Sequence, residues 1–128
     1  MSDALETEPR HILFLDDDDT LVFLVRRLLE RRGYRVTAFS DPIQAIDAVR
    51  AHPEGFDLLL TDFNMPGMSG LDVAKAVLAI NPVLPVAVAS GYITDELQSQ
   101  ARAAGVREVV FKTDAIDAFC EVVARLTS

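Results

Sequence analysis

Short apolar runs recur along the chain, and polar residues follow each of them. Five such runs, of five to seven residues each, occupy residues 11–15, 34–39, 56–62, 85–90 and 106–112. Runs of this length that are rich in Val, Leu, Ile and Phe and are bounded by turn-forming residues are typical of buried strands. The pattern therefore predicts five buried strands.

Stretches of helical periodicity fill the intervals between these runs. In the first, Leu21, Leu24, Val25, Leu28 and Leu29 recur at the spacing of one helix face. Capping and turn-forming residues predict where these helices begin and end. The first ends before Gly33, the second begins at Asp41 and Pro42, and the third runs from Ser69 and Asp72 to Asn81 and Pro82. The fourth lies between Thr94 and Gly105, and the fifth runs from about Ala115 to Leu126.

The alternation of strand and helix determines the fold class. Such units require parallel strands joined by right-handed crossovers, which place helices on both faces of the sheet. We therefore predict an α/β fold with a doubly wound five-stranded parallel sheet and the flavodoxin-like strand order 2-1-3-4-5. In such a sheet, ligands bind beyond the carboxyl ends of the strands, beside the switch point between the first and third strands.

Length and composition favour one domain without disulfides. We expect an N-terminal extension at residues 1–10 and a single domain at residues 11–128. The 20 acidic and 12 basic residues give a net charge of −8, which should repel nucleic-acid phosphates, so we expect no direct nucleic-acid binding. The one cysteine, Cys120, stands among apolar residues and is expected to pack in the core. No segment is long and apolar enough to anchor the chain in a membrane, so we expect a cytoplasmic protein.

Polar side chains end the strands that surround the predicted switch point. Asp16 and Asp17 follow the first strand, Asp62 ends the third, Ser90 ends the fourth and Lys112 ends the fifth. The predicted topology places them all at one edge of the sheet. Neighbouring carboxylates repel one another unless a cation neutralises them, and oxygen ligands without Cys or His favour Mg²⁺. Magnesium beside an aspartate and a lysine indicates phosphoryl transfer to the aspartate.

Four segments, in order along the chain, carry a family resemblance. LDDD (15–18), LLLTDFNMPGMSGLD (58–72), VASGY (88–92) and VFK (110–112) resemble the successive motifs of the response regulator receiver family, over about residues 11–126. The resemblance implies a phosphoacceptor receiver domain at residues 11–128, a signalling phosphoprotein of a two-component or phosphorelay system. It implies a domain that assists its own phosphorylation and slow dephosphorylation and is no enzyme in the ordinary sense.

The resemblance also implies a role for each site residue. Asp62 is the implied phosphoacceptor, Asp16 and Asp17 form the acidic pair, and the backbone carbonyl of Asn64 is a further Mg²⁺ ligand beside these three carboxylates. Lys112 is the implied phosphate-binding cation.

Partners and switching are implied in the same way. Ser90 is the implied switch hydroxyl, whose movement toward the phosphoryl group changes a partner-binding face. The implied partners are a sensor histidine kinase or phosphotransfer protein and a downstream effector protein or domain. We expect either a stand-alone regulator or a piece of a larger protein such as a hybrid kinase. It should be a monomer when unphosphorylated, with a phosphorylation-dependent dimer as an alternative for the phosphorylated state.

Two positions depart from the family pattern. Thr113 follows Lys112 where the family usually has a proline in a cis bond, so the loop after the fifth strand is expected to run differently. Val109 stands where a switching aromatic is common, which leaves Tyr92 as a candidate substitute. An aromatic at Tyr92 could also shield the phosphoryl group from water.

Two rival interpretations remain open from the sequence. FLDDDDTL also fits the D-x-D-x-T pattern of haloacid-dehalogenase-type phosphatases, with Asp16 as nucleophile and Asp18 as acid. That pattern leaves TDFNMPGMSG unexplained. A degenerate receiver that acts only as an interaction module is the other alternative, although the intact acids and lysine argue against it.

Overall fold

Five strands alternate with five helices in the computed structural model, which describes residues 8–112 and 116–128. In chain order the elements are β1 (His11–Leu15), α1 (Asp19–Arg31), β2 (Arg35–Phe39), α2 (Pro42–Ala51), β3 (Leu58–Asp62), α3 (Gly70–Ile80), β4 (Val86–Ser90), α4 (Asp95–Ala103), β5 (Glu108–Phe111) and α5 (Asp117–Thr127). The alternation predicted from the hydrophobic pattern is confirmed.

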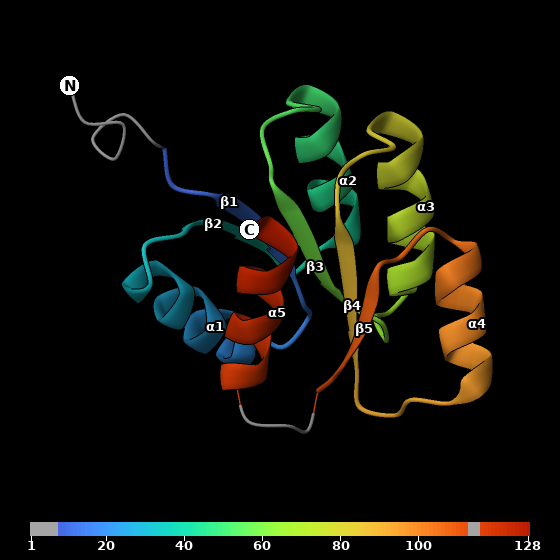
Figure 1. Cartoon of the computed structure of the whole chain (residues 1–128). Helices are drawn as coiled ribbons and strands as arrows, with labels where there is room; N and C mark the ends of the chain where they lie inside the picture. The colour runs from blue at the N-terminus through green and yellow to red at the C-terminus, as the bar shows by residue number, and fades with distance from the viewer. Residues whose placement is uncertain (1–7, 113–115) are drawn as a thin grey trace.

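The strands form one parallel sheet in the order β2-β1-β3-β4-β5 (Figure 1). The predicted α/β class and strand order are therefore confirmed. The register pairs Leu15 with Thr61 and Asp62 with Ala89, so the carboxyl ends of β1, β3 and β4 meet at one edge of the sheet. The switch point lies between β1 and β3, as the topology requires.

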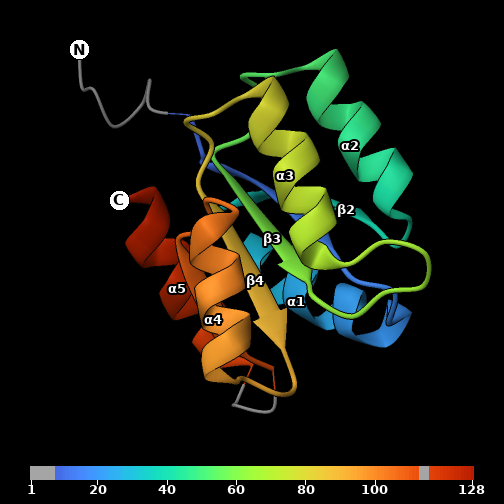
Figure 2. The same cartoon turned by 90° about the vertical axis from the view of Figure 1, so that its right-hand side faces the viewer.

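Successive residues of each strand point to opposite faces, and the sheet therefore separates two apolar cores. Leu13 and Leu59 pack in the core beneath α2, α3 and α4. Phe14 and Leu60 pack on the other face, beneath α1 and α5, where Cys120 is also buried. Figure 2 shows α2, α3 and α4 side by side on the face toward the viewer. Covered on both faces, the sheet holds the polar residues at its edge on a rigid base.

The predicted starts of α2, α3 and α4 are confirmed by capping hydrogen bonds, whereas the predicted start of the last helix at Ala115 lies outside the described residues. Asp41 caps α2 by accepting the backbone N–H of Ile43, and Thr94 caps α4 by accepting that of Leu97. Ser69 and Asp72 form a full capping box at the start of α3. These caps satisfy backbone N–H groups that have no partner within the helix.

Four strands are shorter than predicted. β2 and β4 each begin one residue later, β3 begins two residues later, and β5 begins two residues later and ends one residue earlier. Val106 does not belong to β5, because its N–H donates to the carbonyl of Ala101 and closes the end of α4. Residues 56 and 57 precede β3, and there the Asp57 carboxylate accepts the backbone N–H of His11 at 2.8 Å.

Because Thr113 replaces the usual proline, the loop after β5 was predicted to run differently from the family pattern. Thr113 lies outside the described residues. Val109 is described: it is partly buried and packs against the core beneath α3 and α4. Among residues 8–112 and 116–128, no helix has both the length and the apolar character needed to cross a membrane.

Candidate functional site

Three carboxylates from two strands meet at the carboxyl edge of the sheet. Asp16 and Asp17 directly follow β1, and Asp62 is the last residue of β3. One ligand oxygen from each lies within 4.8 Å of the other two. Asp16 and Asp62 are 1% and 3% exposed, whereas Asp17 is exposed at the mouth of the cluster. The neighbouring position of β1 and β3, predicted from topology, is what brings them together.

Lys112 supplies the positive charge of this cluster. Its Nζ lies 2.9 Å from Oδ2 of Asp16 and 3.3 Å from Oδ1 of Asp62. Lys112 follows β5, and its backbone N–H donates to the carbonyl of Ser90, which fixes the residue to the end of β4. The structure thus brings together the acids and the lysine that the sequence placed at separate strand ends.

The two oxygens of Asp16 have different surroundings. Oδ1 of Asp16 accepts the backbone N–H of Asp18 at 2.9 Å, but the buried Oδ2 accepts no hydrogen bond of good geometry from any described residue. The charge of Lys112 lies near this oxygen, yet a single ammonium cannot balance three carboxylates. Three clustered carboxylates with one ammonium, in an all-oxygen ligand set, fit a divalent cation such as Mg²⁺.

Burial and mutual repulsion change the ionisation of the cluster. Burial, together with the nearby charge of Asp16, raises the pKa of Asp62 to about 6, although Lys112 partly opposes the shift. Burial also raises the pKa of Asp16. For Lys112, burial lowers the pKa but the adjacent Asp16 and Asp62 carboxylates outweigh it, so that its pKa is raised and the side chain stays an ammonium. The negative charges are therefore held at an energetic cost that a metal ion would offset.

Ser90 ends β4 beside this cluster, and its hydroxyl is engaged with the following loop. Oγ of Ser90 donates to the carbonyl of Tyr92 at 2.7 Å and accepts the Tyr92 backbone N–H at 3.2 Å. The Tyr92 side chain itself is 80% exposed. A change in the direction of the Ser90 hydroxyl would release the backbone of Tyr92.

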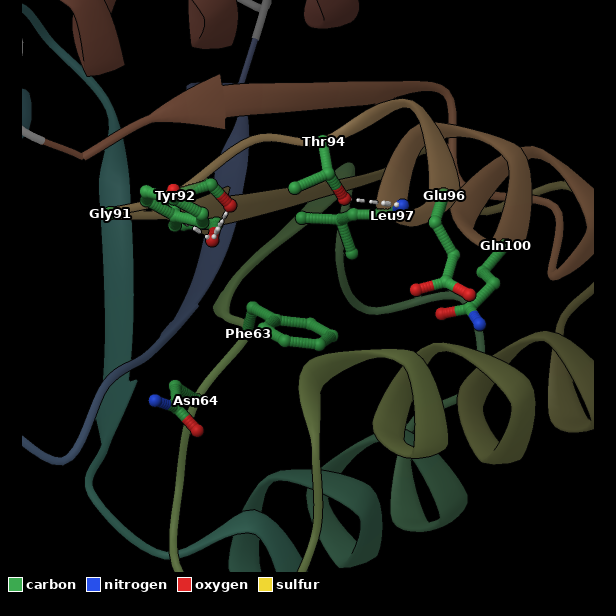
Figure 3. Close-up of a pocket in the computed structure, with 9 residues that line it drawn as sticks. Phe63, Asn64, Gly91, Tyr92, Thr94, Glu96, Leu97 and Gln100 are labelled. Atoms are coloured by element: carbon green, nitrogen blue, oxygen red, sulfur yellow. Dashed lines mark hydrogen bonds between the residues drawn. The ribbon is translucent and has the colours of Figure 1, made fainter.

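The loop after β3 contributes a backbone contact to Asp62. The Asn64 N–H approaches Oδ1 of Asp62 at 3.4 Å, a long hydrogen bond. Next to this loop lies a cavity of about 330 Å³ between the end of β4 and the start of α4. Figure 3 shows the Phe63 ring in this cavity, with Leu97 and Gln100 on its α4 side. Phe63 carries no sequence signal of its own, and only the fold assigns it to the cavity.

Asp18 serves a different purpose from its two acidic neighbours. Its carboxylate accepts the backbone N–H groups of Thr20 and Leu21 and so caps α1. The metal-competent group among the described residues contains Asp16, Asp17 and Asp62 without Asp18. The phosphatase interpretation requires Asp18 as its acid, but the Asp18 carboxylate caps α1.

Comparison with known proteins agrees with this geometry. The family described as response regulator receiver domain matches residues 12–124, from β1 into α5. The response regulator receiver protein CpdR of Brucella abortus is 35% identical over 103 residues, which cover 80% of this chain and 83% of CpdR. The transcriptional regulatory protein ZraR of Klebsiella oxytoca is 32% identical over 101 residues, which cover 79% of this chain and 22% of ZraR. The chain thus spans less than a quarter of the length of ZraR and of other longer curated relatives.

Solved structures match over nearly the whole chain. The receiver domain of the hybrid histidine kinase CckA has a TM-score of 0.77 at 30% identity, covering 92% of this chain and 99% of that domain. The response regulator TrrA of Thermotoga maritima, determined in complex with Mg²⁺ and BeF, has a TM-score of 0.79 at 25% identity and covers 91% of this chain and 98% of TrrA. The matches therefore include both the sheet and its acidic edge.

Proposed function

The chain belongs to the response regulator receiver domain family, and from this premise we propose that Asp62 accepts a phosphoryl group from the phosphohistidine of a kinase. As a receiver domain of a two-component system, it is a signalling module rather than a classical enzyme. The observation that carries the proposal is the buried Asp62 carboxylate, held 3.3 Å from the Lys112 ammonium and within 4.8 Å of the Asp16 and Asp17 oxygens.

Each residue of the cluster would act through its own charge or hydrogen bond. A carboxylate oxygen of Asp62 would attack phosphorus in line with the bond to the donor imidazole, so that an O–P bond forms while the P–N bond breaks and the nitrogen keeps the electron pair. Lys112 would stabilise charge on a transferring oxygen, because its ammonium already lies beside Asp62. Mg²⁺ held by Asp16, Asp17, Asp62 and the Asn64 carbonyl would neutralise charge on the phosphoryl oxygens.

The output would depend on Ser90. Its hydroxyl now bonds the Tyr92 carbonyl, and a phosphoryl group on Asp62 would offer a stronger, charged acceptor. Transfer of the hydroxyl to this acceptor would free the loop before α4 and change the face that an effector contacts. We propose a histidine kinase or phosphotransfer protein as donor, an effector protein or domain as recipient, and a monomeric unphosphorylated chain.

One experiment distinguishes this proposal from its rivals. The protein is incubated with acetyl phosphate and Mg²⁺, the adduct is trapped with borohydride, and the modified peptide is identified by mass spectrometry. We expect one magnesium-dependent adduct at Asp62. Rapid multiple turnover through Asp16 would support the phosphatase instead, and the absence of any magnesium-dependent adduct would support an interaction module without phosphorylation.

Matched variants make the assignment specific. Asp62→Asn should abolish labelling, because the amide is a poor nucleophile. Asp47→Asn removes an exposed carboxylate on α2, which is paired with Arg50, and should label like the wild type. Persistent labelling of Asp62→Asn at the wild-type rate would refute Asp62 as the acceptor.

A further inference from the structure

The loop that follows Asp62 is closed by Gly70, a residue without a side chain. Gly70 is buried and is the first residue of α3, directly after the Ser69 cap. Its backbone N–H donates to the carbonyl of Phe63 at 2.8 Å. This bond joins the two ends of the loop that carries Asn64, the backbone neighbour of the Asp62 carboxylate.

Space, and not backbone conformation, excludes a side chain at Gly70. Among the described residues, positive φ angles occur at Gly33, Gly67 and Gly105, but Gly70 has an ordinary helical backbone. Alanine would be the better helix former there by about 1 kcal/mol. A methyl group at Gly70, however, would overlap the carbonyl oxygen of Asp62, and it would lie 2.9 Å from the Phe63 Cα and 3.1 Å from the Asp62 carbonyl carbon.

The overlapped atoms cannot easily move aside. All three belong to the backbone of Asp62 and Phe63 rather than to a flexible side chain. The Phe63 N–H donates to the carbonyl of Ala89 in β4 at 2.8 Å. The Asp62 carbonyl accepts the buried hydroxyl of Thr61 at 3.0 Å. A methyl group at Gly70 must therefore either lift α3 from the sheet or displace the end of β3.

We propose that Gly70 is a positioning residue for the phosphoacceptor. Because it has no side chain, α3 sits directly against the backbone of Asp62 and Phe63, and this contact fixes the Asp62 carboxylate relative to Lys112 and Asp16. The inference rests on the proposed role of Asp62. It adds the requirement that residue 70 has no side chain, which follows neither from the charge pattern nor from the metal cluster.

The expected effect follows from the distances in the cluster. The ion pairs of Lys112 with Asp16 and Asp62 span 2.9 and 3.3 Å, so a shift of several tenths of an ångström at Asp62 changes them substantially. Misplacement of a reacting group by about 1 Å can lower a rate about 100-fold. We therefore expect Gly70→Ala to lower the rate of labelling at saturating Mg²⁺ by about tenfold or more, and to raise the Mg²⁺ concentration needed for half-maximal labelling.

Gly105→Ala is a matched control at the opposite edge of the sheet. Gly105 follows α4, has φ of +90°, and a methyl group there would meet Leu78 Cδ1 at 2.8 Å. The control is therefore also destabilised, but the perturbation lies at the far end of α4 from Asp62. Both variants and the wild type are labelled with acetyl phosphate over a range of Mg²⁺ concentrations, and their stability is measured by urea unfolding.

The outcomes separate positioning from a general loss of stability. The inference requires slow labelling in folded Gly70→Ala and labelling within about twofold of the wild type in Gly105→Ala. Wild-type kinetics in folded Gly70→Ala would overturn it, as would equally slow labelling in both variants. If Gly70→Ala is unfolded, trimethylamine N-oxide is added to restore the compact state, and wild-type labelling of the restored protein would equally overturn it. Absence of labelling at Asp62 in the wild type would instead refute the proposed function.

Discussion

At the scale of single residues, Asp62 combines burial with negative charge. It is 3% exposed, it lies beside Asp16, and its pKa is raised to about 6 because burial and that neighbour disfavour the carboxylate. Burial of this carboxylate therefore costs stability. Similar conflicts between local environment and charge are common at functional sites.

The first prediction follows from this conflict. Without Mg²⁺ at pH 7.5, Asp62→Asn should raise the free energy of unfolding by about 1 to 3 kcal/mol, because the amide keeps the shape and removes the buried charge. Urea denaturation measures the change. The exposed Asp47→Asn control should change stability by less than about 0.5 kcal/mol.

The pH dependence has a definite sign. The pKa of Asp62 is about 6 in the folded protein and near 3.8 without the fold, so between these values the folded state holds the proton more tightly. The destabilising contribution of Asp62 is therefore complete above about pH 6 and disappears as the pH falls toward 4. The advantage of Asp62→Asn over the wild type should shrink over the same interval, and a constant advantage down to pH 4 would contradict the shift.

Tyr92 gives a second prediction at this scale. Its backbone is hydrogen-bonded to the Ser90 hydroxyl, and its side chain is 80% exposed. We expect the ring to cover the site when the Ser90 hydroxyl turns toward a phosphoryl group. Tyr92→Ala should shorten the half-life of the Asp62 phosphoryl group several-fold by admitting water. Tyr92→Phe keeps the ring and should keep the half-life. An unchanged half-life in Tyr92→Ala would exclude shielding by the ring.

At the scale of elements, α3 shows how a local signal serves the site. The capping box of Ser69 and Asp72 starts the helix, and the next residue, Gly70, lies against the end of β3. The start of the helix thus determines where the loop after Asp62 ends. The capping box at the start of α3 therefore influences a site built by strands that are far apart in the sequence.

A third prediction tests this cap. Ser69→Ala removes the acceptor for the Asp72 N–H and should lower the free energy of unfolding by about 1 kcal/mol. Thermal or urea unfolding provides the measurement. Ser99→Ala lies on the exposed side of α4, makes no cap, and should be neutral or slightly stabilising. Equal effects of the two substitutions would mean that the box contributes nothing to α3.

At the scale of the whole molecule, acidic residues outnumber basic residues. The chain carries a net charge of −8, and three of its carboxylates converge on one edge of the sheet. A divalent cation bound there would relieve repulsion within the cluster and bind only the folded state, because the unfolded chain does not bring β1 and β3 together.

The fourth prediction is a stabilisation by Mg²⁺ that depends on Asp62. Free Mg²⁺ at about 100 times its Kd should raise the free energy of unfolding by about 2.7 kcal/mol, measured as an increase in Tm. NaCl at equal ionic strength screens surface charge only and should have a smaller effect. The Mg²⁺ effect should be much weaker in Asp62→Asn, and an identical Tm increase in that variant would place the ion elsewhere.

The sequence alone determined the elements, their order and the residues at their ends. Hydrophobic periodicity and capping residues are local signals, so they predicted β1 at 11–15 and the starts of α2 and α3 correctly. The rule that parallel strands share one carboxyl edge was enough to bring Asp16, Asp17 and Asp62 together before any coordinates. The start of β3 was less predictable, because the Asp57 carboxylate accepts the His11 N–H of β1, a contact between residues far apart in the sequence.

Only the tertiary structure decided the distances and directions within the site. It placed Lys112 between Asp16 and Asp62, turned the Ser90 hydroxyl toward Tyr92, and set Gly70 against the backbone of Asp62. Residues far apart in sequence acquire such contacts when α3 and β4 pack against β3 and β5 pairs with β4. Packing fixes their separations to a few tenths of an ångström, and a pattern of residue types specifies which groups meet but not how closely.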